Sequence, residues 1–185
     1  MASAPASSSG PISWGRASEA ARTDSRAAAL RRTGVGGTCA RRRVGCVLVD
    51  KHGLVLATGY NGNGRGQGHC IDSPCEGAKF KSGEGLEKCE AIHAEQNAIL
   101  QCKNTEHIEK AYITLSPCVT CVKLLLNTSC KEIVYLEDYV NKDAERIWKN
   151  ANRLWKPATT ALEAGVEVDP TTGLPKLVFS KTDRI

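Results

Sequence analysis

Short apolar runs alternate with segments of helical periodicity along this chain. Residues 44–50 and 54–58 are apolar and rich in β-branched side chains, and the Lys51-His52-Gly53 turn predicts that they form a β-hairpin. Other apolar runs predict strands at 110–115, 132–136 and 166–168, and the helical periodicities predict helices at 14–32, 91–102, 118–127 and, interrupted near Pro157, 143–164. This alternation predicts a three-layer α/β domain.

The length and composition are those of one globular domain. With 185 residues, 41% of them hydrophobic, the chain can bury a single core. Residues 1–13 are mostly Ala, Ser and Pro, so we expect a disordered leader at 1–13, the folded domain at 14–169 and a tail at 170–185. No run approaches the roughly 18 apolar residues of a membrane span, so no membrane association is expected.

Charge and cysteine content narrow the choice of partner and compartment. The 25 Lys and Arg exceed the 20 Asp and Glu by five, which suits an anionic substrate but is too small a surplus to predict nucleic-acid binding. Nine cysteines would suggest disulfides in a secreted protein, but the amino terminus lacks a charged segment followed by an apolar run. We therefore expect a cytoplasmic protein (host cytoplasm if the source is viral) whose clustered cysteines bind metal or lie in the core.

Two motifs contain the residues with the clearest chemical role. Ile92-His93-Ala94-Glu95 and Ser116-Pro117-Cys118-Val119-Thr120-Cys121 together provide one imidazole and two thiolates, which are ligands that Zn²⁺ prefers. Three ligands leave the fourth tetrahedral position open for water, as a catalytic zinc site requires. Glu95 need not be a ligand and can carry the proton of that water. A structural zinc finger is the alternative, which the lack of a fourth nearby ligand disfavours.

A second group of cysteines predicts a structural metal site. Residues 69–89 are polar and irregular, and a segment of that length without its own core needs something to hold it. A closed four-sulfur zinc site would do so, with His69 as a reserve ligand. Its ligands would be Cys39, Cys70, Cys75 and Cys89. The alternative is that these cysteines are free thiols in a loop.

Two further segments are candidate binding loops. The basic triplet 41–43 either grips a phosphate, through Arg42 and Arg43, or forms a solvated surface run. The glycine-rich segment 59–68 follows a predicted strand, so its backbone can approach a ligand closely. Asn61 within it offers both a hydrogen-bond donor and an acceptor to a sugar or base.

These motifs together resemble the cytidine deaminase-like superfamily, and within it the deoxycytidylate (dCMP) deaminase family. An H-x-E motif followed by P-C-x-x-C is the pattern of zinc-dependent nucleobase deaminases. The resemblance runs from about Trp14 to Val168 through T-C-x-R-R-x-V-G, G-Y-N-G, I-H-A-E-x-N-A-I, T-L-S-P-C-x-x-C and E-D-Y. It implies a three-layer α/β/α fold with a mixed five-stranded sheet. It also implies hydrolysis of dCMP to dUMP and ammonia, which supplies dUMP for thymidylate synthesis.

The resemblance assigns roles to individual positions. His93, Cys118 and Cys121 would bind the zinc ion, and Glu95 would be the proton shuttle. The Ser116 carbonyl would accept a hydrogen bond from the departing amine. Asn61 would bind the sugar and base, and Tyr139 would close on the nucleotide. Many members are homo-hexamers activated by dCTP and inhibited by dTTP, with Mg²⁺. An effector site near the glycine loop would use Asn63, Gly64 and Arg65. Phage and bacterial members often carry a second, structural zinc.

Two rival functions share some of these features. A polynucleotide deaminase uses the same zinc chemistry but needs a basic, aromatic-lined groove, whereas this chain has nine aromatic residues (two Phe, three Trp and four Tyr) and a small net charge. A nucleotide-binding module without activity would not need the complete set of catalytic residues. The choice among dCMP, dCTP and a 5-modified dCMP stays open at this level.

Overall fold

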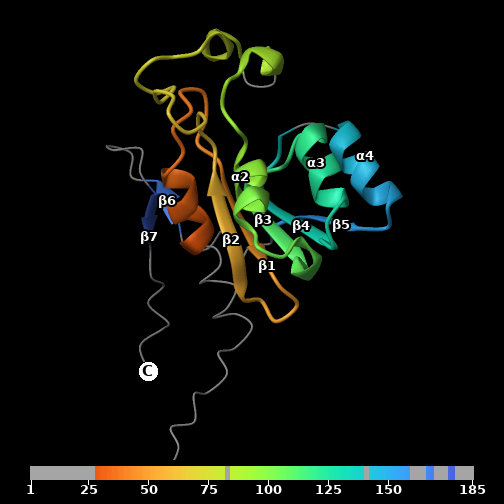
Figure 1. Ribbon diagram of the computed structural model, residues 1–185. Helices are drawn as coiled ribbons and strands as arrows, with labels where there is room; N and C mark the ends of the chain where they lie inside the picture. The colour runs from red at the N-terminus through yellow and green to blue at the C-terminus, as the bar shows by residue number, and fades with distance from the viewer. Residues whose placement is uncertain (1–27, 82–83, 140–141, 159–165, 169–174, 178–185) are drawn as a thin grey trace, which may run out of the picture.

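The computed structural model describes residues 28–81, 84–139, 142–158, 166–168 and 175–177. Its centre is a mixed five-stranded sheet in the order β2-β1-β3-β4-β5 (Figure 1). The strands are β1 (Gly45–Val49), β2 (Val55–Tyr60), β3 (Lys110–Leu115), β4 (Glu132–Glu137) and β5 (Leu154–Pro157). β1 pairs antiparallel with β2 and with β3, whereas β3, β4 and β5 run parallel to one another. The predicted hairpin is therefore confirmed.

Helices cover both faces of the sheet, which confirms the predicted three-layer fold. One face carries α2 (Ala94–Gln101), α3 (Val119–Leu126) and α4 (Lys142–Asn150). The other face carries the helix formed by residues 28–35, whose Leu30 is buried against β1. The rest of the helix predicted at 14–32 and the leader predicted at 1–13 lie outside the described residues.

Strand β1 lies at the centre of the core because both of its faces are buried. Cys46 and Leu48 face the layer of α2, α3 and α4, while Val47 and Val49 face the helix of residues 28–35. This burial on both sides explains why the run reads as continuously apolar rather than alternating. Within the part of the chain that the structure describes, no helix is long and apolar enough to cross a membrane.

The fifth strand differs from the prediction. The helix predicted over 143–164 is wrong for residues 151–158, because α4 ends at Asn150 and the chain turns through Asn152 in the left-handed region (φ 56°) before it forms β5. Residues 159–164 of that prediction lie outside the described residues. Trp155 in β5 contacts Tyr135 in β4, with ring centroids 5.6 Å apart. The predicted strand at 166–168 does form, as β6 (Val166–Val168), but it pairs with β7 (Pro175–Leu177) in a separate two-stranded sheet.

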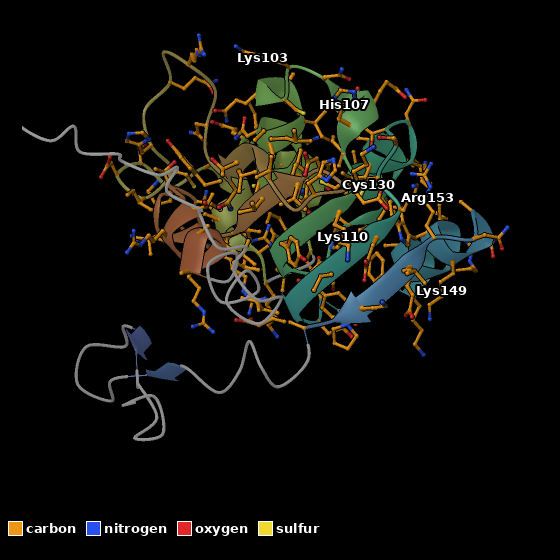
Figure 2. All side chains as sticks on the ribbon, turned by 90° about the horizontal axis from the view of Figure 1, so that it is seen from below. Lys103, His107, Lys110, Cys130, Lys149 and Arg153 are labelled. Carbon is orange, nitrogen blue, oxygen red and sulfur yellow. The ribbon has the colours of Figure 1, made fainter. Side chains whose placement is uncertain are left out.

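Arg153 fixes the carboxyl end of α3 in the helical layer (Figure 2). Its guanidinium donates to the carbonyl oxygen of Leu126, the last residue of α3, at 2.9 Å and to that of Cys130, in the segment after the helix, at 2.7 Å. The Leu126 carbonyl belongs to the last turn of α3, where the C=O groups have no partner within the helix. The opposite end of α3 carries two of the predicted zinc ligands, Cys118 and Cys121.

Candidate metal centre and active site

The amino end of α2 presents His93 and Glu95. His93 is the N-cap residue, and its carbonyl accepts from the Asn97 N–H at 3.0 Å. The Gln96 side chain in turn accepts from the His93 N–H at 2.8 Å, an interaction that belongs to the capping-box arrangement. Glu95 lies in the first turn and is 4% exposed. The local sequence therefore fixes both side chains on one rigid helix start.

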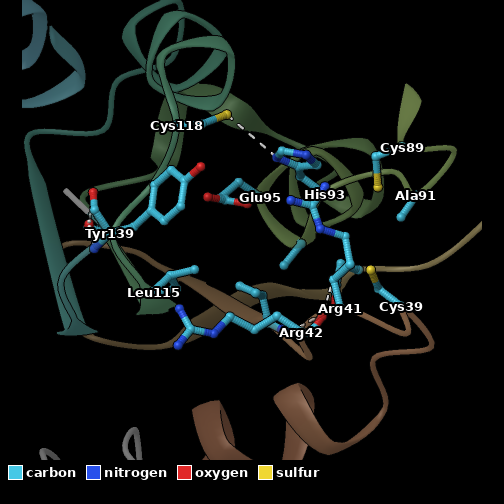
Figure 3. Close-up of a pocket in the computed structure, with 14 residues that line it drawn as sticks. Cys39, Arg41, Arg42, Cys89, Ala91, His93, Glu95, Leu115, Cys118 and Tyr139 are labelled. Atoms are coloured by element: carbon cyan, nitrogen blue, oxygen red, sulfur yellow. Dashed lines mark hydrogen bonds between the residues drawn. The ribbon is translucent and has the colours of Figure 1, made fainter. Parts of the chain in front are cut away.

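The amino end of α3 presents the two thiols beside His93. Cys118 is the N-cap residue and Cys121 lies in the first turn, so both sulfurs project from the same end of the helix. The Nδ1 atom of His93 lies 3.6 Å from the Cys118 Sγ, a contact that Figure 3 marks with a dashed line, and 3.4 Å from the Cys121 Sγ. The three ligand atoms all lie within 4.8 Å of one another. One nitrogen and two sulfur donors this close together fit a tetrahedral zinc ion.

The electrostatics of this cluster favour a thiolate and a protonatable carboxyl. The Cys121 thiol donates to Cys118, and this bond together with the His93 imidazole lowers the pKa of Cys118 to about 4. The hydrogen bond between Cys118 and Cys121 raises the pKa of Cys121, and the hydrogen bond between Cys118 and His93 raises the pKa of His93. Burial raises the pKa of Glu95. A carboxyl whose pKa is raised toward neutrality is suited to take up and release a proton.

A pocket opens directly over these groups. Four separate segments of the chain line it together with Tyr139, whose ring points toward Glu95 in Figure 3. The lining residues from these segments are Cys39, Arg41, Arg42, Val44, Asn61, Cys89, Ala91, His93, Ala94, Glu95, Leu115, Ser116 and Cys118. The pocket lies at the carboxyl ends of β3 and β4, where α/β sheets commonly bind ligands.

Ser116 and Asp138 position Tyr139. The Ser116 hydroxyl donates to an Asp138 carboxylate oxygen at 2.9 Å and accepts from the Tyr139 N–H at 2.6 Å. The side chain of Ser116 is thus used to hold the segment after β4, while the carbonyl assigned from the resemblance is a separate group. Asp138 received no role from the sequence, because only the folded chain shows that it meets Ser116.

Asn61 is buried in the pocket wall with its amide in a fixed orientation. Its Oδ1 accepts from the Val44 N–H at 2.8 Å, and its Nδ2 donates to the Arg42 carbonyl at 2.7 Å. An amide oxygen has two lone pairs and an amide nitrogen has two hydrogens, so each keeps one for a ligand. The bridge between Gly62 and Ile92 ties this loop to the residue just before His93.

The basic triplet divides between the pocket and the surface. Arg42 lines the pocket and forms an ion pair with Glu137, with Nη2 and Oε2 3.1 Å apart. Arg41, the first residue of the triplet, also lines the pocket, and it donates to the Glu84 carbonyl at 2.9 Å. Arg43 is exposed and is not among the lining residues.

The residues predicted for an effector lie beside the pocket rather than in its lining. Asn63 donates to the Gly68 carbonyl at 2.8 Å, and the Gly64 N–H donates to the Gln67 side chain at 3.0 Å. Both contacts stay within the glycine-rich loop and give it a defined turn. Arg65 is exposed at that turn.

The four cysteines predicted for a second metal approach one another, but less closely than the first three ligands. The Sγ atoms of Cys70 and Cys75 are 3.7 Å apart. The pKa of Cys89 is raised by burial and, to a smaller extent, by the nearby Cys39 and Cys75. Among the described residues, the group formed by His93, Cys118 and Cys121 has all its ligand atoms within 4.8 Å, whereas the second group does not meet that spacing. His69 is exposed.

The sequence that forms this site matches a known family and several known proteins. The family described as cytidine and deoxycytidylate deaminase zinc-binding region matches residues 19–137. The deoxycytidylate deaminase of Saccharomyces cerevisiae is 34% identical over 115 residues, which cover 60% of this chain and 36% of that protein. The deoxycytidylate deaminase of Mycobacterium phage D29 is 35% identical over 103 residues, which cover 52% of this chain and 80% of that protein.

Solved structures show the same architecture. The dCMP deaminase of cyanophage S-TIM5 in its apo form aligns with a TM-score of 0.57 at 24% sequence identity, covering 72% of this chain and 94% of that chain. The domain therefore has the cytidine deaminase-like fold. The chain belongs to the cytidine and deoxycytidylate deaminase family, and it contains the family's zinc-binding region. It spans about a third of the length of its two yeast relatives, 36% of one and 32% of the other.

Proposed function

We propose that this protein is a zinc-dependent deaminase that hydrolyses dCMP to dUMP and ammonia. The observation that carries the proposal is the buried carboxyl of Glu95, which lies in the lining of the pocket together with the ligands His93 and Cys118. The relatives named deoxycytidylate deaminase support the substrate. The cyanophage S-TIM5 dCMP deaminase has also been solved in complex with dCMP and dUMP.

Proton transfer by Glu95 is the central step of the proposed mechanism. When bound, the zinc ion supplies a water molecule whose pKa is lowered toward about 7. Glu95 takes a proton from water and delivers it to N3 of the pyrimidine, which makes C4 electrophilic toward attack by the water oxygen. Glu95 then passes the second proton to the amino group at C4, which leaves as ammonia. A single carboxyl performs these transfers because it lies beside the metal ligands and is shielded from solvent.

The remaining lining residues orient the nucleotide. Asn61 has one free lone pair and one free N–H for the sugar and base, Tyr139 closes over the ring, and the Ser116 carbonyl accepts from the departing amine. Arg42 reaches the 5′ phosphate from the pocket lining. Arg43, which is exposed, remains a predicted phosphate ligand. These assignments are supported by the pocket lining and by the family to which the chain belongs.

A second zinc ion, held by Cys39, Cys70, Cys75 and Cys89, is part of the proposal. Support comes from the approach of Cys70 and Cys75 and from the electrostatic contact of Cys89 with Cys39. We expect metal analysis of the purified protein to find a second equivalent of zinc that Cys75→Ser removes. The control is Cys102→Ser, because the Cys102 thiol donates only to the nearby Asn104 carbonyl. A single equivalent in the unmodified protein would contradict the second site.

The regulation and assembly of the protein are proposed from the same resemblance. We expect activation by dCTP and inhibition by dTTP, each with Mg²⁺, at a site that includes Asn63, Gly64 and Arg65. We also expect a homo-hexamer in the cytoplasm that supplies dUMP for thymidylate synthesis. The defined turn in the glycine-rich loop supports an effector site there.

The proposed activity is tested by ammonia release from a panel of substrates. The zinc-loaded protein is incubated with dCMP, dCTP, CMP and deoxycytidine, each with and without dCTP or dTTP as effector. The proposal predicts turnover of dCMP that dCTP raises and dTTP lowers. Silence on every free nucleotide would overturn it and favour a polynucleotide substrate or a binding role.

A further inference from the structure

An ion pair joins Arg42, which lines the pocket, to Glu137, which lies next to the lining residues Leu115 and Ser116. Arg42 precedes β1 and Glu137 is the last residue of β4, and the pair lies at 3.1 Å between Nη2 and Oε2. The Arg42 side chain is 45% exposed and that of Glu137 is 67% exposed, so the pair is open to solvent and to an entering ligand. We refer to Arg42 and Glu137 as the rim pair.

The backbone on both sides holds the rim pair against the pocket wall. The Arg42 carbonyl accepts from the buried amide of Asn61, which fixes the start of the arginine side chain. The Glu137 carbonyl accepts from the Ser116 N–H at 2.8 Å, and Glu137 is in register with Leu115 of β3. Leu115 and Ser116 both line the pocket. Figure 3 shows Arg42 extending along the pocket toward the side of Leu115 and Tyr139.

The geometry points to Glu137 as a specificity-determining residue: it holds Arg42 in an ion pair that the 5′ phosphate of the substrate must share. Its charge thereby favours a monophosphate over a longer phosphate chain. This inference rests on the proposed deamination of a nucleotide in this pocket. It concerns a residue that neither coordinates the metal nor transfers a proton.

The phosphate and the Glu137 carboxylate share the guanidinium of Arg42. Arg has five N–H donors, so Arg42 can bond a phosphate while it keeps its contact with Glu137. The phosphate and the Glu137 carboxylate then lie close together, and like charges at that distance repel. A monophosphate carries a charge of about −1.5 to −2, and each additional phosphate adds to the repulsion. A neutral nucleoside has no such charge and is not affected.

The size of the effect follows from the exposure of the pair. Exposed charge pairs contribute little free energy because solvent screens them. Removal of the Glu137 charge should therefore change the affinity for a monophosphate by only about two- to fivefold. The effect should shrink at about 1 M salt, where the screening length falls to roughly 3 Å. A change that persists at high salt would indicate an altered pocket shape instead of a lost charge.

The test compares Glu137→Gln with Glu145→Gln. Glu145→Gln is the matched control because it removes the same charge from an exposed pair, with Lys149 at 2.6 Å on α4, outside the pocket lining. KM and kcat are measured for dCMP, dCDP and deoxycytidine. We expect Glu137→Gln to lower KM for dCMP by about two- to fivefold and for dCDP by more. We expect the KM for deoxycytidine and the kcat for dCMP to change much less.

A second substitution and a binding measurement complete the test. In an Arg42→Gln background, Glu137→Gln should no longer change the KM for dCMP, because the residue that it modulates is gone. Calorimetric titration with dUMP should show the same two- to fivefold gain in affinity without any turnover. If wild-type protein turns over dCMP but Glu137→Gln matches the control, the inference is overturned and the proposed function survives. If wild-type protein neither turns over dCMP nor binds dUMP, the proposed function itself fails.

Discussion

At the scale of single residues, Gly59 shows how tightly helix α2 packs against the sheet. A Cβ built at Gly59 would lie 2.3 Å from the Ala94 carbonyl oxygen and 2.3 Å from the Ala98 nitrogen. Both atoms belong to the helix that presents Glu95. The glycine is therefore required by close approach of the backbone rather than by its own conformation.

The Gly59→Ala substitution should destabilise the protein. An added methyl group has to displace helix backbone, and overpacking of this kind costs about 1–3 kcal/mol. Gly68→Ala is the matched control, because a Cβ at Gly68 meets nothing within 4 Å. Urea unfolding of both variants measures the difference, with Gly68→Ala expected within about 0.5 kcal/mol of the wild type. Equal stability of the two variants would contradict this packing.

The roles of some site residues can be predicted from the sequence, whereas those of others cannot. His93, Glu95, Cys118 and Cys121 could be predicted because each motif places its residues within one helical turn, so local spacing determines their geometry. The roles of Asp138 and Arg41 depend on contacts with distant segments, namely Ser116 and the Glu84 carbonyl. No local pattern signals such contacts.

At the scale of elements, Glu132 joins three parallel strands. It opens β4, and its carboxylate contacts Lys110 of β3 and Lys156 of β5, both at 2.9 Å (Figure 2 labels Lys110). Burial alone would raise the pKa of Glu132, but the two lysines lower it more, so the net pKa lies below the ordinary value of 4.5. The ionised carboxylate therefore stabilises the folded sheet.

The stabilisation by Glu132 should depend on pH. Because the folded-state pKa is lowered, the contribution is complete above the unfolded-state pKa and is lost as pH falls through the folded-state value. Glu132→Gln should therefore cost about 1–3 kcal/mol at pH 7, and its deficit should shrink on acidification below pH 4.5. Denaturant unfolding across this pH range measures the deficit. A deficit that stays constant down to pH 2 would exclude titration of Glu132 as its source.

The fifth strand shows why an element can be missed. Residues 143–164 contain good helix formers, and α4 does begin where the pattern predicts, but Leu154–Pro157 is only four residues long and ends in proline. Its extended form depends on parallel pairing with β4 and on the contact of Trp155 with Tyr135. These are tertiary interactions, so propensity and periodicity alone did not reveal them.

At the scale of the whole molecule, the metal centre links two helices that are far apart in sequence. His93 lies at the start of α2 and the two cysteines at the start of α3, and these segments meet only in the folded chain. Metal bound to such a site stabilises the native state, because the unfolded chain does not hold the ligands together.

Removal of the metal should therefore lower the melting temperature. We expect a chelator to reduce it by about 10 °C or more, which corresponds to several kcal/mol for a chain of this size, and added zinc to restore it. The His93→Ala variant serves as the control, because loss of one ligand should make its melting temperature less sensitive to the chelator. A melting temperature that the chelator leaves unchanged would contradict a linked metal centre.

In the proposed hydrolytic deamination, Glu95 moves the protons. The most direct measurement is the rate of dCMP conversion by the wild-type protein and by Glu95→Gln, with zinc content determined for both. We expect equal zinc content and equal dUMP binding, with a rate for Glu95→Gln lower by about two to four decades. A Glu95→Gln variant that retains zinc and turns over dCMP at nearly the wild-type rate would contradict this role of Glu95.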